Sequence, residues 1–90
     1  MKVRWSEQSE MNLRAIYAHV AADAPMAAAR LLQRLVDAGE SLADHPHRGR
    51  RAAADTRELT TVPPYLIRYR LRRGEVEILR IRHGARRPLR

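Results

Sequence analysis

Residues 56–87 are rich in arginine and contain segments in which apolar and polar side chains alternate, and this period of two constrains the fold more than any other feature of the chain. Within residues 65–72, Ile67, Tyr69 and Leu71 would lie on one face of a strand. The opposite face would carry Leu66, Arg68, Arg70 and Arg72. The pattern therefore predicts a sheet with one apolar face against a core and one basic face that is free to meet a partner.

A second strand is expected directly after the first. Arg73 and Gly74 form a short turn, since glycine tolerates positive φ, and residues 75–83 return as the partner strand. The apolar residues of this strand change phase between Ile78 and Leu79. The change predicts either a β-bulge or a central strand with apolar contacts on both faces.

The first half of the chain predicts a short strand followed by two helices. Residues 2–5 alternate polar and β-favouring residues, and Ser6 is a suitable N-cap for a helix over residues 7–22. Pro25 suits the first turn of a second helix, which ends before Pro46. The apolar faces of the two helices would be formed by Leu13, Ile16, Tyr17 and Val20, and by Ala28, Leu31, Leu32, Leu35, Ala38 and Leu42.

The segment between the helices and the hairpin completes the fold class. Residues 45–55 contain proline, glycine and arginine without periodicity and are expected to form a loop, in which Gly49 supplies a turn. Residues 57–61 are predicted as a strand that ends before the Pro-Pro pair. The order β-α-α-β-β-β indicates an α+β fold with a helical hairpin packed on a small, mostly antiparallel sheet. We expect a single domain over residues 1–90.

The positive charge is concentrated in the same half of the chain as the hairpin. Residues 48–90 carry thirteen arginines against four acidic residues, a net charge of +9, whereas residues 1–47 have a net charge of −1. Such asymmetry is typical of a surface that binds nucleic acid or an acidic protein. The alternative is an ordinary solvated face in a protein that uses arginine instead of lysine, as 17 of its 18 basic residues do.

Composition excludes several classes of function. A chain of 90 residues forms one small domain without room for a deep cofactor cavity. It has no cysteine for a disulfide or thiolate zinc site, and its four histidines lack metal-motif spacing, so no metal or cofactor is expected. No apolar stretch approaches the roughly 18 residues of a membrane span, and the first residues lack the apolar region of a signal peptide. We therefore expect a cytoplasmic protein without membrane contact.

An ordered series of short motifs covers nearly the whole chain. It consists of Trp5-Ser6, a helix around Ile16, residues 28–42, Leu42-x-x-x-Pro46-x-x-Gly49-Arg50, Arg57-Glu58-Leu59, Tyr65-x-Ile67-x-Tyr69, and Val76-x-Ile78-Leu79-x-Ile81-x-His83-x-x-Arg86. The series resembles the RelE/ParE superfamily of toxins from type II toxin-antitoxin modules. The resemblance implies one of two activities. RelE-like members are ribosome-dependent endoribonucleases that cleave mRNA, whereas ParE-like members inhibit DNA gyrase.

Two positions favour the ParE-like branch. RelE-like members have an arginine directly after the tyrosine that opens the penultimate strand, where this chain has Leu66. Nuclease members often carry an arginine or tyrosine near the C-terminus where this chain has Gly84. Cleavage of RNA through its 2′-OH needs a base, an acid and cations that stabilise the phosphorane, and neither residue supplies them. The resemblance therefore implies a gyrase inhibitor without an active site of its own.

A RelE-like mRNA endoribonuclease is the alternative. His83 would then act as acid or base, because an imidazole titrates in the useful range. ParE-like members often have histidine at this position too, and a hydrogen-bonded anchor at a strand end is an equal possibility. The phosphate-binding residues of the nuclease would be Arg57, Arg80 and Arg86. An equal possibility for Arg57 is a structural role, as an exposed strand residue that pairs with Glu58 or Glu77.

In the ParE-like interpretation the hairpin arginines form a docking surface for acidic protein. The partners implied by the resemblance are DNA gyrase as target and a cognate antitoxin. Antitoxins of this class are typically ribbon-helix-helix DNA-binding dimers with a disordered tail that folds along the toxin. The nuclease alternative implies the ribosome and mRNA instead. The candidate residues for binding the antitoxin or the target are Arg68, Arg70, Arg80, Arg82, His83, Arg86 and Arg87.

Overall fold

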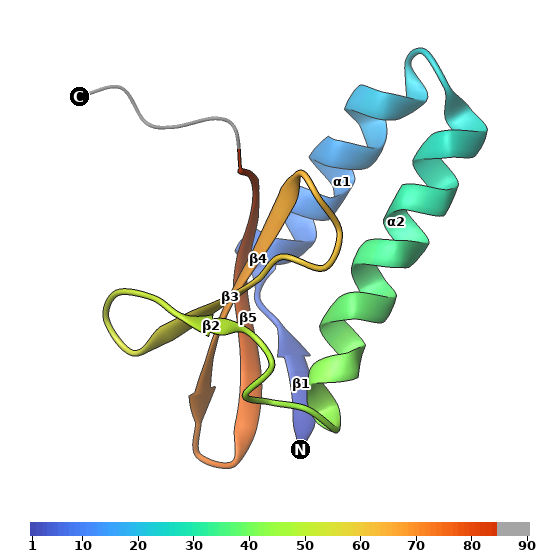
Figure 1. Cartoon of the computed structure of the whole chain (residues 1–90). Helices are drawn as coiled ribbons and strands as arrows, with labels where there is room; N and C mark the ends of the chain where they lie inside the picture. Colours follow the sequence, from blue (N-terminus) through green and yellow to red (C-terminus); the bar gives the residue numbers. More distant parts are fainter. Residues whose placement is uncertain (85–90) are drawn as a thin grey trace.

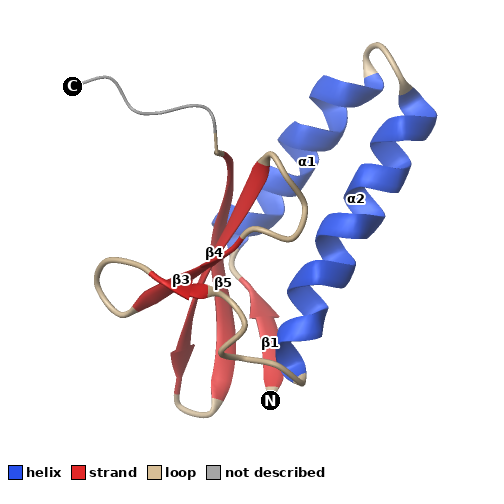
Figure 2. Cartoon of the chain, in the orientation of Figure 1, coloured by secondary structure: helices blue, strands red, loops and turns tan. Residues whose placement is uncertain are grey.

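The computed structural model describes residues 1–84, in which a helical hairpin lies along one side of a sheet (Figure 1). Figure 2 shows the two helices, the strands and the loops that connect them. The elements in chain order are β1 (Lys2–Trp5), α1 (Glu7–Ala21), α2 (Pro25–Glu40), the 3-10 helix η1 (Ser41–Ala43), β2 (Arg50–Arg51), β3 (Thr56–Leu59), β4 (Tyr65–Arg72) and β5 (Glu75–His83).

The strands form one sheet in the order β1-β5-β4-β3-β2. The pair β1–β5 is parallel, and the other neighbouring pairs are antiparallel. A parallel pair requires a long connection, and here it consists of the helical hairpin followed by β2, β3 and β4. The α+β fold predicted from the sequence, a helical hairpin on a small and mostly antiparallel sheet, is therefore confirmed.

Ser6 begins α1 as the sequence predicts. Its Oγ accepts the N–H of Ser9 at 3.0 Å and donates to the carbonyl oxygen of Leu79 at 2.9 Å. The same hydroxyl thus caps the helix and holds it against β5. The second helix begins at Pro25, also as predicted, and continues as the 3-10 helix η1 beyond Glu40. The first helix ends one residue earlier than predicted.

The phase change in β5 is a β-bulge. The register of the β4–β5 ladder shifts by one residue between Arg68 and Tyr69, and Leu79 is the extra residue on β5. Because of this insertion Ile78 and Ile81 both face the helices although they lie three positions apart, and both are buried. The predicted bulge is confirmed, and β5 is also an interior strand between β1 and β4.

Two predictions for the segment before the hairpin are wrong. Residues 45–55 are not all loop, because Arg50–Arg51 form β2 and pair antiparallel with β3. Backbone hydrogen bonding to a neighbouring strand outweighs the loop-like composition there. Strand β3 covers Thr56–Leu59 rather than residues 57–61, because the chain turns after Leu59 and buries Val62 against the core.

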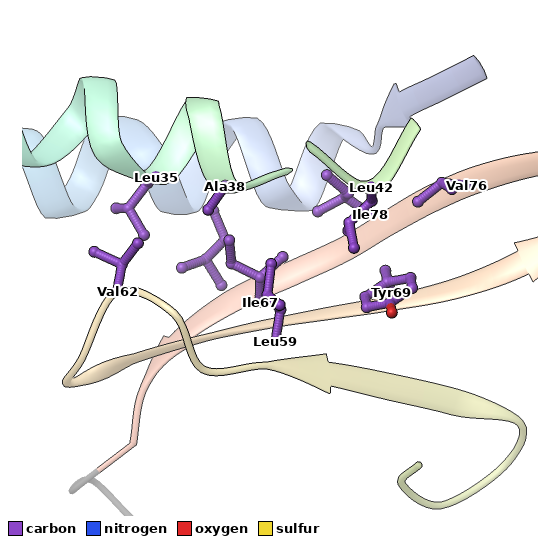
Figure 3. Close-up of a cluster of buried hydrophobic side chains, with 10 residues drawn as sticks. Leu35, Ala38, Leu42, Leu59, Val62, Ile67, Tyr69, Val76 and Ile78 are labelled. Atoms are coloured by element: carbon purple, nitrogen blue, oxygen red, sulfur yellow. The ribbon is translucent and has the colours of Figure 1, made fainter. Parts of the chain in front are cut away.

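The core fills the space between α2 and the sheet (Figure 3). It consists of Leu35, Ala38, Leu42, Leu59, Val62, Ile67, Tyr69, Val76, Ile78 and Ile81. From α1, Leu13 and Ile16 pack against its edge. The predicted apolar face of β4 is confirmed, since Ile67 and Tyr69 are buried and Leu71 is half-buried. Neither helix is long and apolar enough to cross a membrane within residues 1–84.

Candidate interaction surface

The face of the sheet turned away from the helices, called the outer face below, presents a row of charged side chains. Strand pairing places Arg50, Glu58, Arg68 and Arg80 opposite one another across β2, β3, β4 and β5. Arg82 lies on the same face, two positions beyond Arg80. These four arginines around Glu58 are called the arginine cluster. They gather because their strands adjoin, although they come from segments up to 32 positions apart.

Glu58 is the centre of the arginine cluster and is only 6% exposed. Its Oε2 accepts hydrogen bonds from Nη2 of Arg68 at 2.6 Å and Nη2 of Arg82 at 3.3 Å. Its Oε1 lies 3.5 Å from Nη2 of Arg50. The hydrogen bond from Arg68 is the largest cause that holds the pKa of Glu58 below its ordinary value, against the opposing effect of burial. The carboxylate is therefore ionised and shared among three cations.

A second group of charges lies on the outer face near the hairpin turn. Glu77 accepts a hydrogen bond from Nε of Arg70 at 2.7 Å and lies 3.7 Å from Arg4, which also reaches Glu75. The hydrogen bond from Arg70 is the main cause that lowers the pKa of Glu77. Arg70, a predicted docking residue, is therefore already paired within the chain.

Arg80 differs from its neighbours in the arginine cluster. It is exposed, and no carboxylate within residues 1–84 pairs with it. Arg68 and Arg82 are paired to Glu58, with side chains that are 29% and 33% exposed. Of the predicted docking residues, Arg86 and Arg87 lie outside the described residues. The outer face is thus basic as predicted, but two of its arginines are held inward by a carboxylate.

His83 projects toward the helix side of the sheet, opposite to Arg80 and Arg82. Its ring meets Tyr65 edge-on, with the centroids 5.4 Å apart. Both rings line a surface concavity at the end of β5, between α1 and the outer face. The other described residues that line it are Asn12, Ala15, Ile16, His19, Val20, Arg50, Leu66, Arg68, Arg80, Ile81, Arg82 and Gly84.

Leu66 and Gly84 line the same concavity as His83 and supply no cation to it. The N–H of Gly84 donates to the carbonyl oxygen of Pro64 at 2.6 Å. A Cβ on Gly84 would lie 2.9 Å from that oxygen and 3.5 Å from Cγ of Leu66. A larger residue at position 84 therefore requires the backbone of the neighbouring segment to move, and the half-buried Leu66 contributes no charge.

Arg57 does not join the other candidate residues. It donates from Nη1 to the carbonyl oxygens of Gly49 at 2.8 Å and His47 at 3.3 Å. Among residues 1–84 it forms no ion pair with Glu58 or Glu77, so that predicted pairing is wrong. Its role at a phosphate site beside His83 stays a prediction. Arg57 pairs with Tyr69 and His83 with Tyr65, so strand spacings separate the two residues by roughly 16 Å. Arg57 instead fixes the loop that leads into β2.

Sequence patterns did not identify the two residues that organise this region. For Glu58 the sequence suggests only a pairing with Arg57, although an acid in a strongly basic half of the chain is a signal for internal ion pairing. Asn12 was not considered, yet its Oδ1 accepts the N–H of Ile81 at 3.0 Å, beyond the end of the β1–β5 ladder. It thereby satisfies a backbone donor that no strand covers.

The chain resembles known toxins along almost its whole length. The family model described as ParE toxin of type II toxin-antitoxin system, parDE, matches residues 3–88. Toxin RelE2 of Caulobacter vibrioides is 47% identical over 85 residues, which cover 94% of this chain and 97% of that protein. Toxin RelE1 of the same organism is 45% identical over 64 residues, which cover 67% of this chain and 68% of that protein.

A solved structure agrees with the sequence relatives. The fold matches a chain in the structure described as the chromosomal ParDE TA system from P. aeruginosa with a TM-score of 0.83 and 27% identity. The match covers 92% of this chain and 95% of that one. The sequence match and the shared fold agree on one assignment. This chain belongs to the ParE toxin family of type II toxin-antitoxin systems.

Proposed function

We propose that this toxin acts in the cytoplasm by inhibiting DNA gyrase through protein contacts, and that a cognate antitoxin neutralises it. The observation that carries the proposal is the lack of a cation at the two positions beside His83, where Leu66 has no charge and a side chain at Gly84 would meet the carbonyl of Pro64. Arg57 is also committed to backbone carbonyls away from His83. An RNA-cleaving centre needs an acid, a base and cations around one phosphate, and these residues do not converge on such a point.

The outer face supports a protein partner with acidic groups. Arginine binds carboxylates bidentately, and Arg80 and Arg50 are the exposed members of the arginine cluster. In this proposal the antitoxin is a ribbon-helix-helix DNA-binding protein whose disordered tail folds along the toxin. Its acidic groups compete with gyrase for the basic face, which explains neutralisation by occupancy.

An mRNA endoribonuclease is the second candidate. Two observations favour it: the relatives named above are RelE toxins, and His83 shares its concavity with Tyr65, Arg80 and Arg82. In this case His83 is the proton-transfer residue, and the two arginines stabilise the phosphorane. The two candidates predict different cellular lesions.

Expression of the toxin from an inducible promoter separates the candidates. The gyrase proposal expects loss of plasmid supercoiling in the cell, inhibition of purified gyrase, and intact mRNA at the onset of growth arrest. Rapid translation arrest with codon-phased mRNA cuts and normal gyrase activity would refute it. Coexpression of a cognate antitoxin should restore growth in either case and therefore serves only as a control for specific toxicity.

Two variants sharpen the test. His83→Gln should leave most of the gyrase inhibition in place, because His83 faces the helix side and the outer face keeps its arginines. In a nuclease it should abolish mRNA cleavage by removing proton transfer. Arg80→Ala should weaken gyrase inhibition, because Arg80 is exposed and has no carboxylate partner within residues 1–84. Arg14→Ala is the matched control, since Arg14 is an exposed arginine of α1 and its removal changes the net charge equally. Equal effects of the two arginine variants would assign the loss to net charge instead of the outer face.

A further inference from the structure

Glu58 occupies the only position on the outer face that touches three arginines of the described chain. Its two oxygens meet Arg50, Arg68 and Arg82 at 3.5, 2.6 and 3.3 Å. The side chain of Glu58 is 7% exposed. An incoming anion can bridge Arg68 and Arg82 only by taking the place of this carboxylate. The chain thus supplies its own anion to the centre of the arginine cluster.

A carboxylate and a phosphate compete for arginine on similar terms. The guanidinium fork matches the oxygens of both groups. Glu58 is part of the chain, so it competes at the high effective concentration of an intramolecular ligand. A phosphate that approached without displacing it would meet a negative charge at short range. Nε of Arg68 has no hydrogen-bond partner in the described chain, but it is buried and therefore not open to an incoming phosphate.

We propose that Glu58 is a specificity-determining residue: its carboxylate occupies the site where a nucleic-acid phosphate would bridge Arg68 and Arg82, and so excludes phosphodiesters from the arginine cluster. The outer face keeps its positive potential for protein partners through Arg50 and Arg80. It does not offer a converging group of cations to RNA or DNA. The inference rests on the proposed function in one respect, namely that a protein partner binds the outer face.

The rest of the outer face agrees with this assignment. The strand residues that project there are Lys2, Arg4, Arg50, Thr56, Glu58, Leu66, Arg68, Arg70, Arg72, Glu75, Glu77, Arg80 and Arg82. None of them is aromatic, whereas sequence-tolerant binding of single strands relies on aromatic rings that stack on bases. Single-stranded RNA would therefore depend on phosphate contacts alone, and Glu58 blocks the strongest of these.

Binding of a short fluorescein-labelled oligouridylate to the full chain tests the inference by fluorescence anisotropy. We expect Glu58→Gln to bind roughly tenfold more tightly than the unaltered protein, because Arg68 and Arg82 become available to phosphates. Two new phosphate contacts should also steepen the dependence of log K on log salt concentration by about 1.4, at about 0.7 per contact. Equal affinity and equal slope for the two proteins would overturn the inference.

Glu77→Gln is the matched control for charge. Glu77 lies on the same face and also pairs with arginines, and its replacement changes the net charge by the same amount. It lies outside the arginine cluster, so we expect less than about a threefold gain in affinity, from the long-range field alone. If Glu77→Gln tightens binding as much as Glu58→Gln does, net charge explains the effect and Glu58 has no specific role.

A double variant keeps the test decisive if Glu58→Gln fails to fold, as judged by circular dichroism. Glu58→Gln with Arg50→Gln restores the net charge of the unaltered protein and lowers the repulsion among the arginines, while Arg68 and Arg82 are both still released. Tighter RNA binding than that of the unaltered protein is expected, and equal or weaker binding would overturn the inference. Binding is measured without gyrase or cells, so a negative result here is distinct from failure of the proposed function.

Discussion

Trp5 of β1 lies against Gly39 of α2 so closely that no side chain fits at position 39. A Cβ on Gly39 would lie 2.5 Å from Cζ2 of the indole and 2.9 Å from Cδ1 of Ile78. The indole Nε1 also donates to Oε2 of Glu40 at 2.7 Å, which holds the ring across the helix. A glycine near the C-terminal end of α2 therefore allows the helix to pack directly on the edge strand.

Gly39→Ala should destabilise the protein. In an exposed helix interior the same replacement gains about 1 kcal/mol, because alanine has the higher helix propensity. Here the added methyl group overlaps the indole, and overpacking of this kind costs about 1–3 kcal/mol. Urea denaturation should show a net loss of unfolding free energy. In a Trp5→Leu background the clash is removed, so the alanine should become neutral or stabilising; persistence of the full loss there would contradict the steric explanation.

The hydroxyl of Tyr69 should contribute measurably to the free energy of unfolding. It accepts the N–H of Gly49 at 2.8 Å and donates to the carbonyl oxygen of Pro46 at 2.7 Å. Tyr69 is fully buried, so Tyr69→Phe leaves two backbone groups without partners and should cost about 1–3 kcal/mol of unfolding free energy. Tyr17→Phe removes a hydroxyl from an exposed helix position and should change stability by less than about 0.5 kcal/mol. Equal effects of the two variants would refute this assignment.

The sequence predicted the elements whose apolar residues repeat over several turns or strand positions. The two helices, β1, the hairpin and its bulge all follow from such periods. It did not predict β2, because two consecutive arginines carry no period and their strand exists only through pairing with β3. Gly49 lies at a bend of the chain, in line with the predicted turn, although its φ is not positive. Glycine is required there because a Cβ would lie 2.7 Å from Cε1 of Tyr69.

The sequence predicted that the candidate surface is positively charged, but it did not predict which side chains pair with one another there. Charge asymmetry indicated the basic outer face, and alternation in β4 placed Arg68 and Arg70 on it. The partners of these arginines depend on the register between β3, β4 and β5, which loop lengths and the bulge determine. No local pattern encodes that register. Glu58 consequently emerged as the centre of the arginine cluster only in the folded chain.

Glu58 should make stability fall in acid. Its pKa in the folded protein is lower than in the unfolded chain, so its contribution is fully present above the unfolded value of about 4.3 and is lost as pH falls through the folded value. Protonation leaves Arg50, Arg68 and Arg82 without their shared counter-ion. Urea denaturation between about pH 3 and 7 should show a decline that begins below about pH 5.

Glu58→Gln should remove a large part of that decline and lower stability at neutral pH. Removing one partner of a buried ion pair costs about 3–5 kcal/mol in general. A smaller decline should persist, because the pKa of Glu77 is also lowered and its contribution has the same sign. An unchanged acid profile in Glu58→Gln would show that other carboxylates control the transition.

Asn12 should control the opening of the last part of β5. Strand β1 pairs with residues 75–78, and beyond that point the Oδ1 of Asn12 accepts the N–H of Ile81. Asn12→Ala leaves this edge donor without its partner and should cost about 1 kcal/mol. Hydrogen exchange at the amide of Ile81 should accelerate by roughly fivefold or more, while the amide of Val76 changes only with global stability. Asn12→Asp retains an acceptor and should keep most of the protection; equal acceleration in both variants would show that the hydrogen bond does not hold this edge.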